Sequence, residues 1–152
     1  MQETGFDPAC LELELTEGVV IAEDAGAVQT LGSLKALGLH LAIDDFGTGY
    51  SALSRLRALP FDTLKVDKIF VDELADSNQE STLAESILDM ARVLGLKVVA
   101  EGVETSAQAE FLRRRGCDFA QGYLFSRPVE PLAFAALVMQ GGSLRVPAAA
   151  VA

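Results

Sequence analysis

The chain has 152 residues, of which 50% are hydrophobic and 22% charged, and its formal net charge is −10. This length and balance suit one globular domain with a sizeable core and exclude a disordered chain. The negative charge argues against a general binder of DNA, RNA or anionic membranes, because most of the surface would repel such partners. A ligand that bears phosphate would need a bound metal or a local cationic group to meet it.

Cys10 and Cys117 lie far apart in the sequence and lack the spacing of metal ligands. We interpret them as ordinary small apolar residues, which fits a reducing, cytoplasmic location. No apolar run reaches the length of a transmembrane helix, and the first residues do not follow the pattern of a signal peptide. His40 lies inside an apolar run and is interpreted as structural.

Short apolar runs alternate with amphipathic stretches along the chain, which is typical of parallel βα units. The predicted strands are 11–15, 39–43, 62–67, 96–100 and 118–123. Five such units are expected in a single domain over residues 1–140. Residues 141–152 are rich in Gly, Pro and Ala and are expected to form a flexible tail.

The predicted helices follow from apolar spacing and from start and stop signals. The first begins at Glu23 or Asp24, places Val28, Leu31, Leu34 and Leu37 on one side, and ends at Gly38. Others are expected over 51–59, which Pro60 ends, and along the stripe Leu83, Ile87, Met90 and Leu94. Capping-box spacing occurs at Ser77 with Glu80 and at Thr105 with Gln108. A last helix begins near Pro131.

Polar residues gather where each predicted strand ends. They are Glu14 and Glu17, Asp44 and Asp45, Lys65 and Asp67, Glu101 and Glu104, and Gln121. In a parallel barrel these ends meet on one rim, which is where barrel enzymes carry their sites. Each acid also has an ordinary interpretation as a turn residue or helix cap, most plausible for Glu17, Asp67 and Glu104.

So many carboxylates on one rim would raise one another's pKa values unless cations neutralise them. Oxygen ligands suit hard ions such as Mg²⁺ or Mn²⁺, and the chain has no set of His and Cys residues that suggests zinc. Two such ions can bridge a phosphodiester and activate a water. A spare Glu can then serve as general base, and a Lys can meet the negative charge of the phosphate or orient the water.

Several ordered motifs resemble the later part of the EAL domain family. They are Glu14-Leu15-Thr16-Glu17, Asp44-Asp45-Phe46-Gly47-Thr48-Gly49-Tyr50-Ser51, Leu64-Lys65-Val66-Asp67, Val99-Ala100-Glu101-Gly102-Val103-Glu104-Thr105, and Gln121-Gly122-Tyr123-Leu124-Phe125-Ser126-Arg127-Pro128. The family consists of bacterial cyclic di-GMP phosphodiesterases with a TIM-like barrel, which use Mg²⁺ or Mn²⁺ to form linear pGpG. The resemblance implies an α/β fold that corresponds to the last five βα units of that barrel.

The resemblance also assigns roles to the strand-end residues. Glu14, Asp44 and Asp45 look like metal ligands of a two-metal site, Lys65 like the lysine beside the catalytic water, and Glu101 like the general base. Gln121 looks like the residue that closes the site. Glu17 resembles the acid that steadies the loop after Asp45, through which a homodimer is expected. Glu104 looks like a further second-metal or supporting acid, and Asp67 like a supporting or substrate-side acid.

The family's Glu-Ala-Leu strand and its metal-binding Asn, expected before Leu11, have no counterpart in this sequence. A full barrel has eight strands, so the chain resembles the C-terminal part of an EAL domain. Weak or absent turnover by this chain alone is therefore expected. The alternative is a non-catalytic module that binds cyclic di-GMP or another protein.

Overall fold

The computed structural model describes residues 3–18, 25–47, 56–75 and 83–139. The elements in chain order are η1 (Pro8–Cys10), β1 (Glu12–Thr16), α2 (Ala25–Ala36), β2 (His40–Phe46), β3 (Thr63–Val66), α4 (Lys68–Asp72), η2 (Glu73–Ala75), α5 (Leu83–Leu94), β4 (Lys97–Ala100), α6 (Ser106–Arg114), β5 (Phe119–Ala120) and α7 (Pro131–Met139). Most of the predicted helix 51–59, the predicted capping box at Ser77 and the predicted tail lie outside the described residues.

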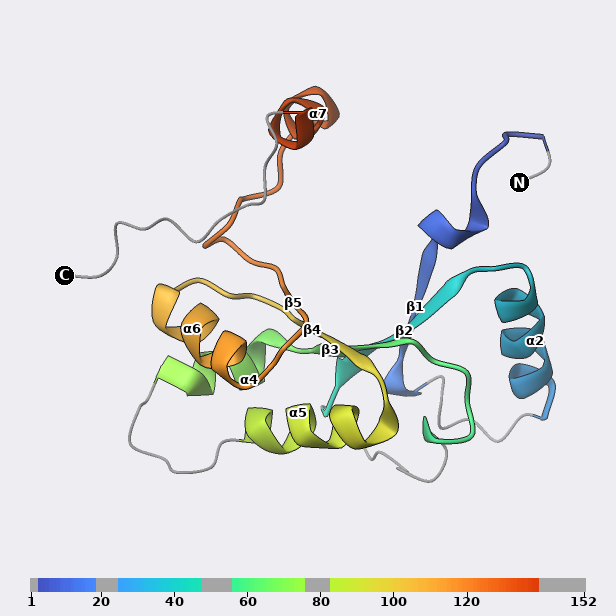
Figure 1. Cartoon of the computed structure of the whole chain (residues 1–152), viewed down its shortest axis with the longest axis horizontal. Helices are drawn as coiled ribbons and strands as arrows, with labels where there is room; N and C mark the ends of the chain where they lie inside the picture. The colour runs from blue at the N-terminus through green and yellow to red at the C-terminus, as the bar shows by residue number, and fades with distance from the viewer. Residues whose placement is uncertain (1–2, 19–24, 48–55, 76–82, 140–152) are drawn as a thin grey trace.

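The five strands form one parallel sheet in the order β1-β2-β3-β4-β5, as predicted (Figure 1). Sequential parallel neighbours joined by helical crossovers are the βα arrangement of barrel folds. Strand β1 alternates as expected, with its glutamates exposed and Leu13 and Leu15 packed against the core. The carboxyl ends of all five strands therefore lie at one edge.

The centre of the sheet is buried on both faces. Leu41, Ile43, Leu64 and Val66 are fully buried, and every residue of β3 is buried. Strands covered on both faces often read as continuous apolar runs, as Leu41, Ala42 and Ile43 of β2 do. Strand β3 differs, because the polar residues Thr63 and Lys65 alternate with Leu64 and Val66 and are buried with them.

Helices α4, α5 and α6 gather beside β3 to β5, and α2 lies on the β1–β2 side (Figure 1). The apolar stripe predicted for α5 is largely confirmed, since Ile87 is buried and Met90 and Leu94 pack against the core, whereas Leu83 is 52% exposed. In α2 only part of the predicted stripe is covered. Leu31 is buried and Leu34 packs against the core, but Val28 and Leu37 are exposed.

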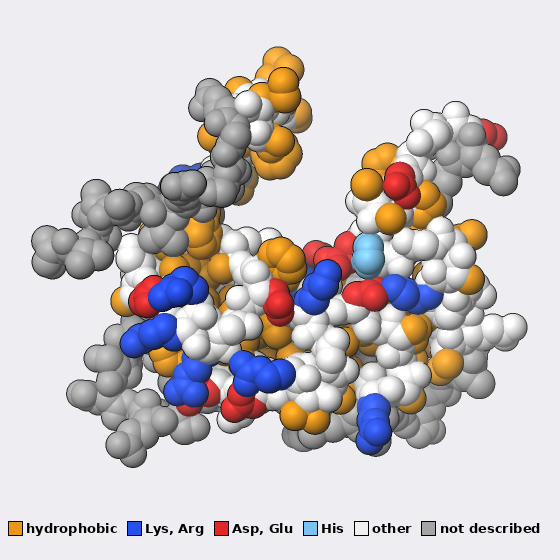
Figure 2. All heavy atoms as spheres, viewed as in Figure 1, with side chains coloured by type: hydrophobic (Ala, Val, Ile, Leu, Met, Phe, Trp, Pro, Cys, Tyr) orange, Lys and Arg blue, Asp and Glu red, His pale blue; other side chains and the backbone are white. Residues whose placement is uncertain are grey.

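Helix α7 stands apart from the other elements (Figure 1). Its sequence is apolar all round, yet none of its residues is buried, and hydrophobic side chains cover its surface in Figure 2. Exposed apolar surface of this extent marks a contact region. None of the helices in the described ranges is long and apolar enough to cross a membrane.

Three details differ from the sequence prediction. Strand β2 continues through Asp44 and Asp45 to Phe46, where a loop was expected, and its pairing with β3 shifts between Ile43 and Phe46. Strand β5 is only two residues long. The short helix α4 was missed because its five residues are too few to show a helical period.

Candidate functional site

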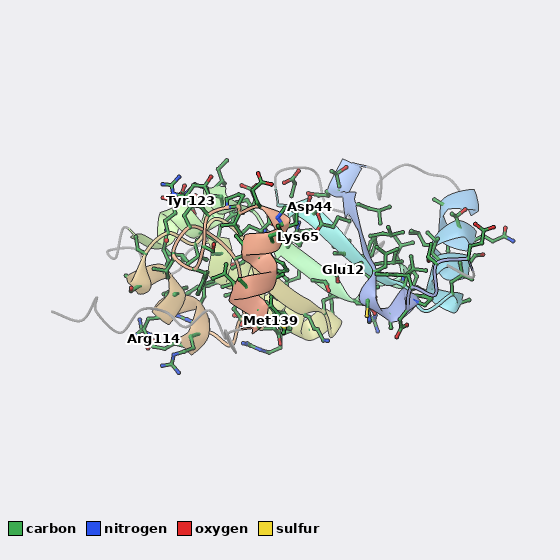
Figure 3. The ribbon with its side chains drawn as sticks, turned by 90° about the horizontal axis from the view of Figure 1, so that it is seen from above. Glu12, Asp44, Lys65, Arg114, Tyr123 and Met139 are labelled. Carbon is green, nitrogen blue, oxygen red and sulfur yellow. The ribbon has the colours of Figure 1, made fainter. Side chains whose placement is uncertain are left out.

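Lys65 lies at the centre of the strand-end cluster. Its ammonium Nζ is 2.8 Å from Glu14 Oε2, 3.0 Å from Asp44 Oδ1 and 2.8 Å from Glu101 Oε1. The lysine side chain is only 9% exposed, and Figure 3 shows it beside Asp44. The sheet thus brings three of the predicted acids together around one buried cation, which is itself a predicted site residue.

The parallel register explains this convergence. Glu14 belongs to β1, Asp44 pairs with Thr16 across the β1–β2 ladder, and Glu101 directly follows β4. Gln121, the residue after β5, donates a hydrogen bond from Nε2 to Glu101 Oε1 at 2.8 Å. Each strand therefore contributes one member of the cluster, from within β1, β2 and β3 and from the residue directly after β4 and β5.

Three carboxylates hold Lys65 in its charged form. Burial opposes the charge, but contacts with Glu101, Glu14 and Asp44 outweigh this cost and raise the pKa of Lys65 above its ordinary value. Lys65 is therefore a permanent cation at neutral pH. With three carboxylates around one ammonium the cluster keeps a negative formal charge, so a ligand bearing phosphate would still need bound cations to meet it.

Asp45 occupies a strained position beside this cluster. Its φ of 54° is left-handed, and it lies in the bulge where β2 carries an extra residue against β3. A bulge breaks the alternation of a strand and re-aims its side chains, which is typical next to active sites. The negative charge of Asp44, followed by burial and by Asp67, raises the pKa of the Asp45 carboxyl.

The donors partly fit the predicted metal site. Asp44 Oδ1 is buried and, within the described residues, accepts no well-aligned hydrogen bond, although Lys65 lies close to it. A buried carboxylate oxygen of this kind suits a hard cation. Across the described residues, however, no three His, Cys, Asp or Glu side chains are grouped to hold one ion. Glu14, Asp44 and Asp45 thus have the right chemistry without converging on one point.

Glu17 is not a solvated turn residue. It is 3% exposed, and its Oε2 accepts a hydrogen bond of 3.2 Å from the backbone N–H of Gly47. Gly47 has a φ of +95°, and a Cβ there would lie 2.9 Å from the Phe70 ring. Glu17 therefore holds the start of the segment that follows Asp45.

Asp67 and Glu104 have local partners. Asp67 is the N-cap of α4, and its side chain accepts a hydrogen bond from the N–H of Ile69 at 2.8 Å, so its interpretation as a helix cap is correct. Glu104 is bound by Lys68, whose Nζ lies 2.8 Å from Glu104 Oε1. These acids support the segments on either side of the cluster.

A cavity of about 740 Å³ adjoins the cluster. Lys68, Glu101, Glu104 and Gln121 line one side, and Phe134, Leu137 and Val138 of α7 line the other. Arg127 also lines it, with its guanidinium 4.5 Å from the centre of the Tyr123 ring. Neither Lys68 nor Arg127 was predicted as a site residue. Arg127 lies within the EAL-like motif 121–128, and Lys68 directly follows the motif 64–67.

Comparison with known proteins gives a consistent result. The model of the EAL domain family matches residues 1–128. The cyclic di-GMP phosphodiesterase NbdA of Pseudomonas aeruginosa is 48% identical over 133 residues, which cover 88% of this chain and 17% of NbdA. The chain thus spans less than a fifth of the length of this relative.

Solved structures agree with the fold. The PaMucR phosphodiesterase in complex with c-di-GMP has a TM-score of 0.81 at 41% identity, over 88% of this chain and 54% of that chain. Klebsiella pneumoniae BlrP1 with manganese and cyclic di-GMP has a TM-score of 0.69 at 36% identity, over 84% and 32% of the two chains. The five strands therefore correspond to part of an EAL barrel.

Proposed function

Because this chain belongs to the EAL domain family, we propose that its strand-end residues hydrolyse cyclic di-GMP to linear pGpG when the barrel around them is complete. One observation carries this proposal. A buried lysine of β3 joins Glu14 of β1, Asp44 of β2 and Glu101, which follows β4, within 3.0 Å, so the contacts span four neighbouring strands.

Glu101 is assigned as the general base. Its contacts with Lys65 and Gln121 both use Oε1, so Oε2 is the oxygen that would take a proton from the attacking water. The water oxygen bonds to phosphorus, and the ester bond from phosphorus to the leaving 3′ oxygen breaks. One proton ends on the product hydroxyl, and the second phosphodiester of the ring stays intact in pGpG.

Lys65 is assigned the role of stabilising the negative charge of the phosphate. Its ammonium is fixed by three carboxylates and keeps its proton at neutral pH. A preorganised cation of this kind stabilises charge that develops in the transition state.

Glu14 and Asp44 would hold Mg²⁺ or Mn²⁺, with Asp45 toward a second ion. Bound divalent ions of this type polarise the phosphoryl oxygens and lower the pKa of a bound water. The manganese in the BlrP1 structure and the buried oxygen of Asp44 support this assignment. Glu17, Asp67 and Glu104 support the segments around the site, and a homodimer would form through the loop after Asp45.

The test compares the chain alone with the same chain preceded by the first strands of the MucR EAL domain, in Mn²⁺ or Mg²⁺. We expect the fused protein to form pGpG, measured by chromatography, and the chain alone to form little. Glu101→Gln and Lys65→Ala should abolish turnover in the fused protein while Glu110→Gln, on exposed α6, leaves it unchanged. Hydrolysis retained in Glu101→Gln or Lys65→Ala would contradict their roles.

A second function is a non-catalytic module that binds cyclic di-GMP. It is favoured by the absence, among the described residues, of three grouped metal-ligating side chains. Calorimetry of the chain with cyclic di-GMP in excess chelator separates the two. Micromolar binding without turnover by the fused protein supports the sensor, and no heat at any concentration removes it.

A further inference from the structure

Lys68 lies across the backbone of the segment that carries Glu101. A Cβ built on Gly102 would lie 2.4 Å from Cγ of Lys68 and 2.6 Å from its Cβ. Gly102 also has a φ of +67°, which L side chains rarely adopt. The glycine after Glu101 therefore allows the alkyl chain of Lys68 to rest directly on this backbone.

The ammonium of Lys68 completes the contact. Nζ lies 2.8 Å from Glu104 Oε1 and 3.0 Å from Asp72 Oδ1, and these two acids raise the pKa of the lysine. Both acids are about half exposed, at 47% and 50%. Exposed ion pairs of this kind add little to global stability. Global stability therefore does not account for the position of the Lys68 side chain.

The remaining contacts show what is held in place. The N–H of Glu101 donates to Val66 O at 3.0 Å, and the N–H of Val103 donates to Gln121 O at 3.0 Å. Gln108 accepts from the N–H of Glu104 at 2.9 Å and donates to Val71 O at 3.2 Å. The 101–104 segment is therefore fixed at both ends, and Lys68 covers its middle.

We propose that Lys68 is a positioning residue that sets the placement of the Glu101 carboxylate by clamping Gly102 and Glu104 against the start of α4. Without this clamp the middle of the segment, at Gly102, shifts toward the 740 Å³ cavity, which Lys68, Glu101 and Gly102 line. Glu101 Oε1 then loses its shared contact with Lys65 and Gln121. This inference rests on the proposed function only where it treats Glu101 as the general base of hydrolysis.

The test uses amide NMR spectra of the full 152-residue chain. The side-chain amide of Gln121 reports on Glu101 Oε1, to which it donates, and hydrogen exchange at Val103 reports on the segment. The variants are Lys68→Met, Lys68→Arg and Gly102→Ala. Arg113→Met is the matched control, because it removes an exposed pair of the same 2.8 Å length, with Glu110, on α6.

In Lys68→Met and Gly102→Ala we expect the Gln121 side-chain signals to shift and exchange at Val103 to quicken about tenfold, a change in opening free energy of about 1.4 kcal/mol. Lys68→Arg should restore the wild-type spectrum, and Arg113→Met should not alter it. The thermal midpoint of Lys68→Met should match the wild type.

Unchanged Gln121 signals in Lys68→Met, the same shift in Arg113→Met, or no rescue by arginine would each overturn the proposal. A general loss of stability in Lys68→Met would also overturn it, because Lys68 would then be merely structural. The spectra do not depend on turnover. They therefore distinguish a failure of this inference from a failure of the proposed function. In the fused enzyme, Lys68→Met should lower kcat more than it raises KM.

Discussion

At the scale of single residues, the site depends on how charges are paired. The sequence was sufficient to place one lysine and several acids at strand ends, because strand ends are readable from short apolar runs. The sequence could not show that Lys65 contacts three carboxylates, since these contacts depend on the register between the paired strands. The left-handed Asp45 was equally unpredictable, because a bulge is set by pairing between strands.

Glu17 provides a first prediction. Glu17→Ala leaves the N–H of Gly47 without its partner in a partly buried position, which should cost about 1 kcal/mol of unfolding free energy. Urea denaturation measures the loss. Glu17→Gln keeps an acceptor oxygen and should retain most of the stability, and equal losses in both variants would contradict the role of the hydrogen bond.

Asp62 predicts how stability depends on pH. Lys35 Nζ lies 2.7 Å from both carboxylate oxygens, and the N–H of Leu41 donates to one of them at 2.9 Å. Although burial opposes ionisation, these contacts lower the pKa of Asp62 below its ordinary value. The carboxylate therefore stabilises the fold above about pH 4, and this contribution is lost as pH falls through the lowered pKa.

Asp62→Asn should consequently cost about 1 kcal/mol at pH 7 and flatten the decline of stability between about pH 5 and pH 3. Urea midpoints measured at several pH values test this. Asp89→Asn, which breaks an exposed pair with Arg92 on α5, is the control. A decline as steep in Asp62→Asn as in the wild type would show that another group titrates.

At the scale of elements, local signals were accurate where they act through the backbone. The capping box of α6 is formed as predicted, with Thr105 Oγ1 accepting from the N–H of Gln108 and Gln108 accepting from the N–H of Thr105. Apolar stripes were less accurate, because burial depends on which neighbours cover the helix. Val28 and Leu37 have the spacing of core residues in α2, yet 50% and 60% of their surface is exposed.

The capping box yields a prediction for α6. Thr105→Ala removes the acceptor for the N–H of Gln108 and should cost about 1 kcal/mol, which lowers the thermal midpoint by about 2–4 °C in a domain of this size. Thr105→Ser keeps the acceptor and should melt close to the wild type. Differential scanning calorimetry compares the two, and identical melting of both variants would argue against the cap.

At the scale of the whole molecule, the described part of the chain leaves the outer edges of β1 and β5 without a paired strand, and no residue of α7 is buried. The fold class could be predicted from the sequence, because short apolar runs alternate with amphipathic stretches in five βα units. The position of α7 could not, since an apolar helix has no preferred face until a neighbour covers it. Leu132 and Met139 are 87% and 86% exposed, and unpaired strand edges add to the surface open to association.

We therefore expect the chain to self-associate as its concentration rises, which sedimentation velocity measures. Leu132→Lys with Met139→Lys should shift the distribution toward the monomer. Val93→Lys is the matched control, because Val93 is 86% exposed on α5 and lies away from α7. Equal effects of both changes would mean that added charge, and not α7, controls association.

The metal dependence of pGpG formation is the most direct test of the strand-end cluster as the hydrolytic site. The fused protein that completes the barrel is incubated with cyclic di-GMP in Mn²⁺ or in excess chelator, alongside its Asp44→Asn variant. We expect pGpG only from the unsubstituted protein with Mn²⁺, because Asp44 supplies a buried carboxylate oxygen, beside the Lys65 ammonium, to the proposed metal site. Equal turnover in chelator, or in Asp44→Asn, would contradict the assignment of the strand-end cluster as the hydrolytic site.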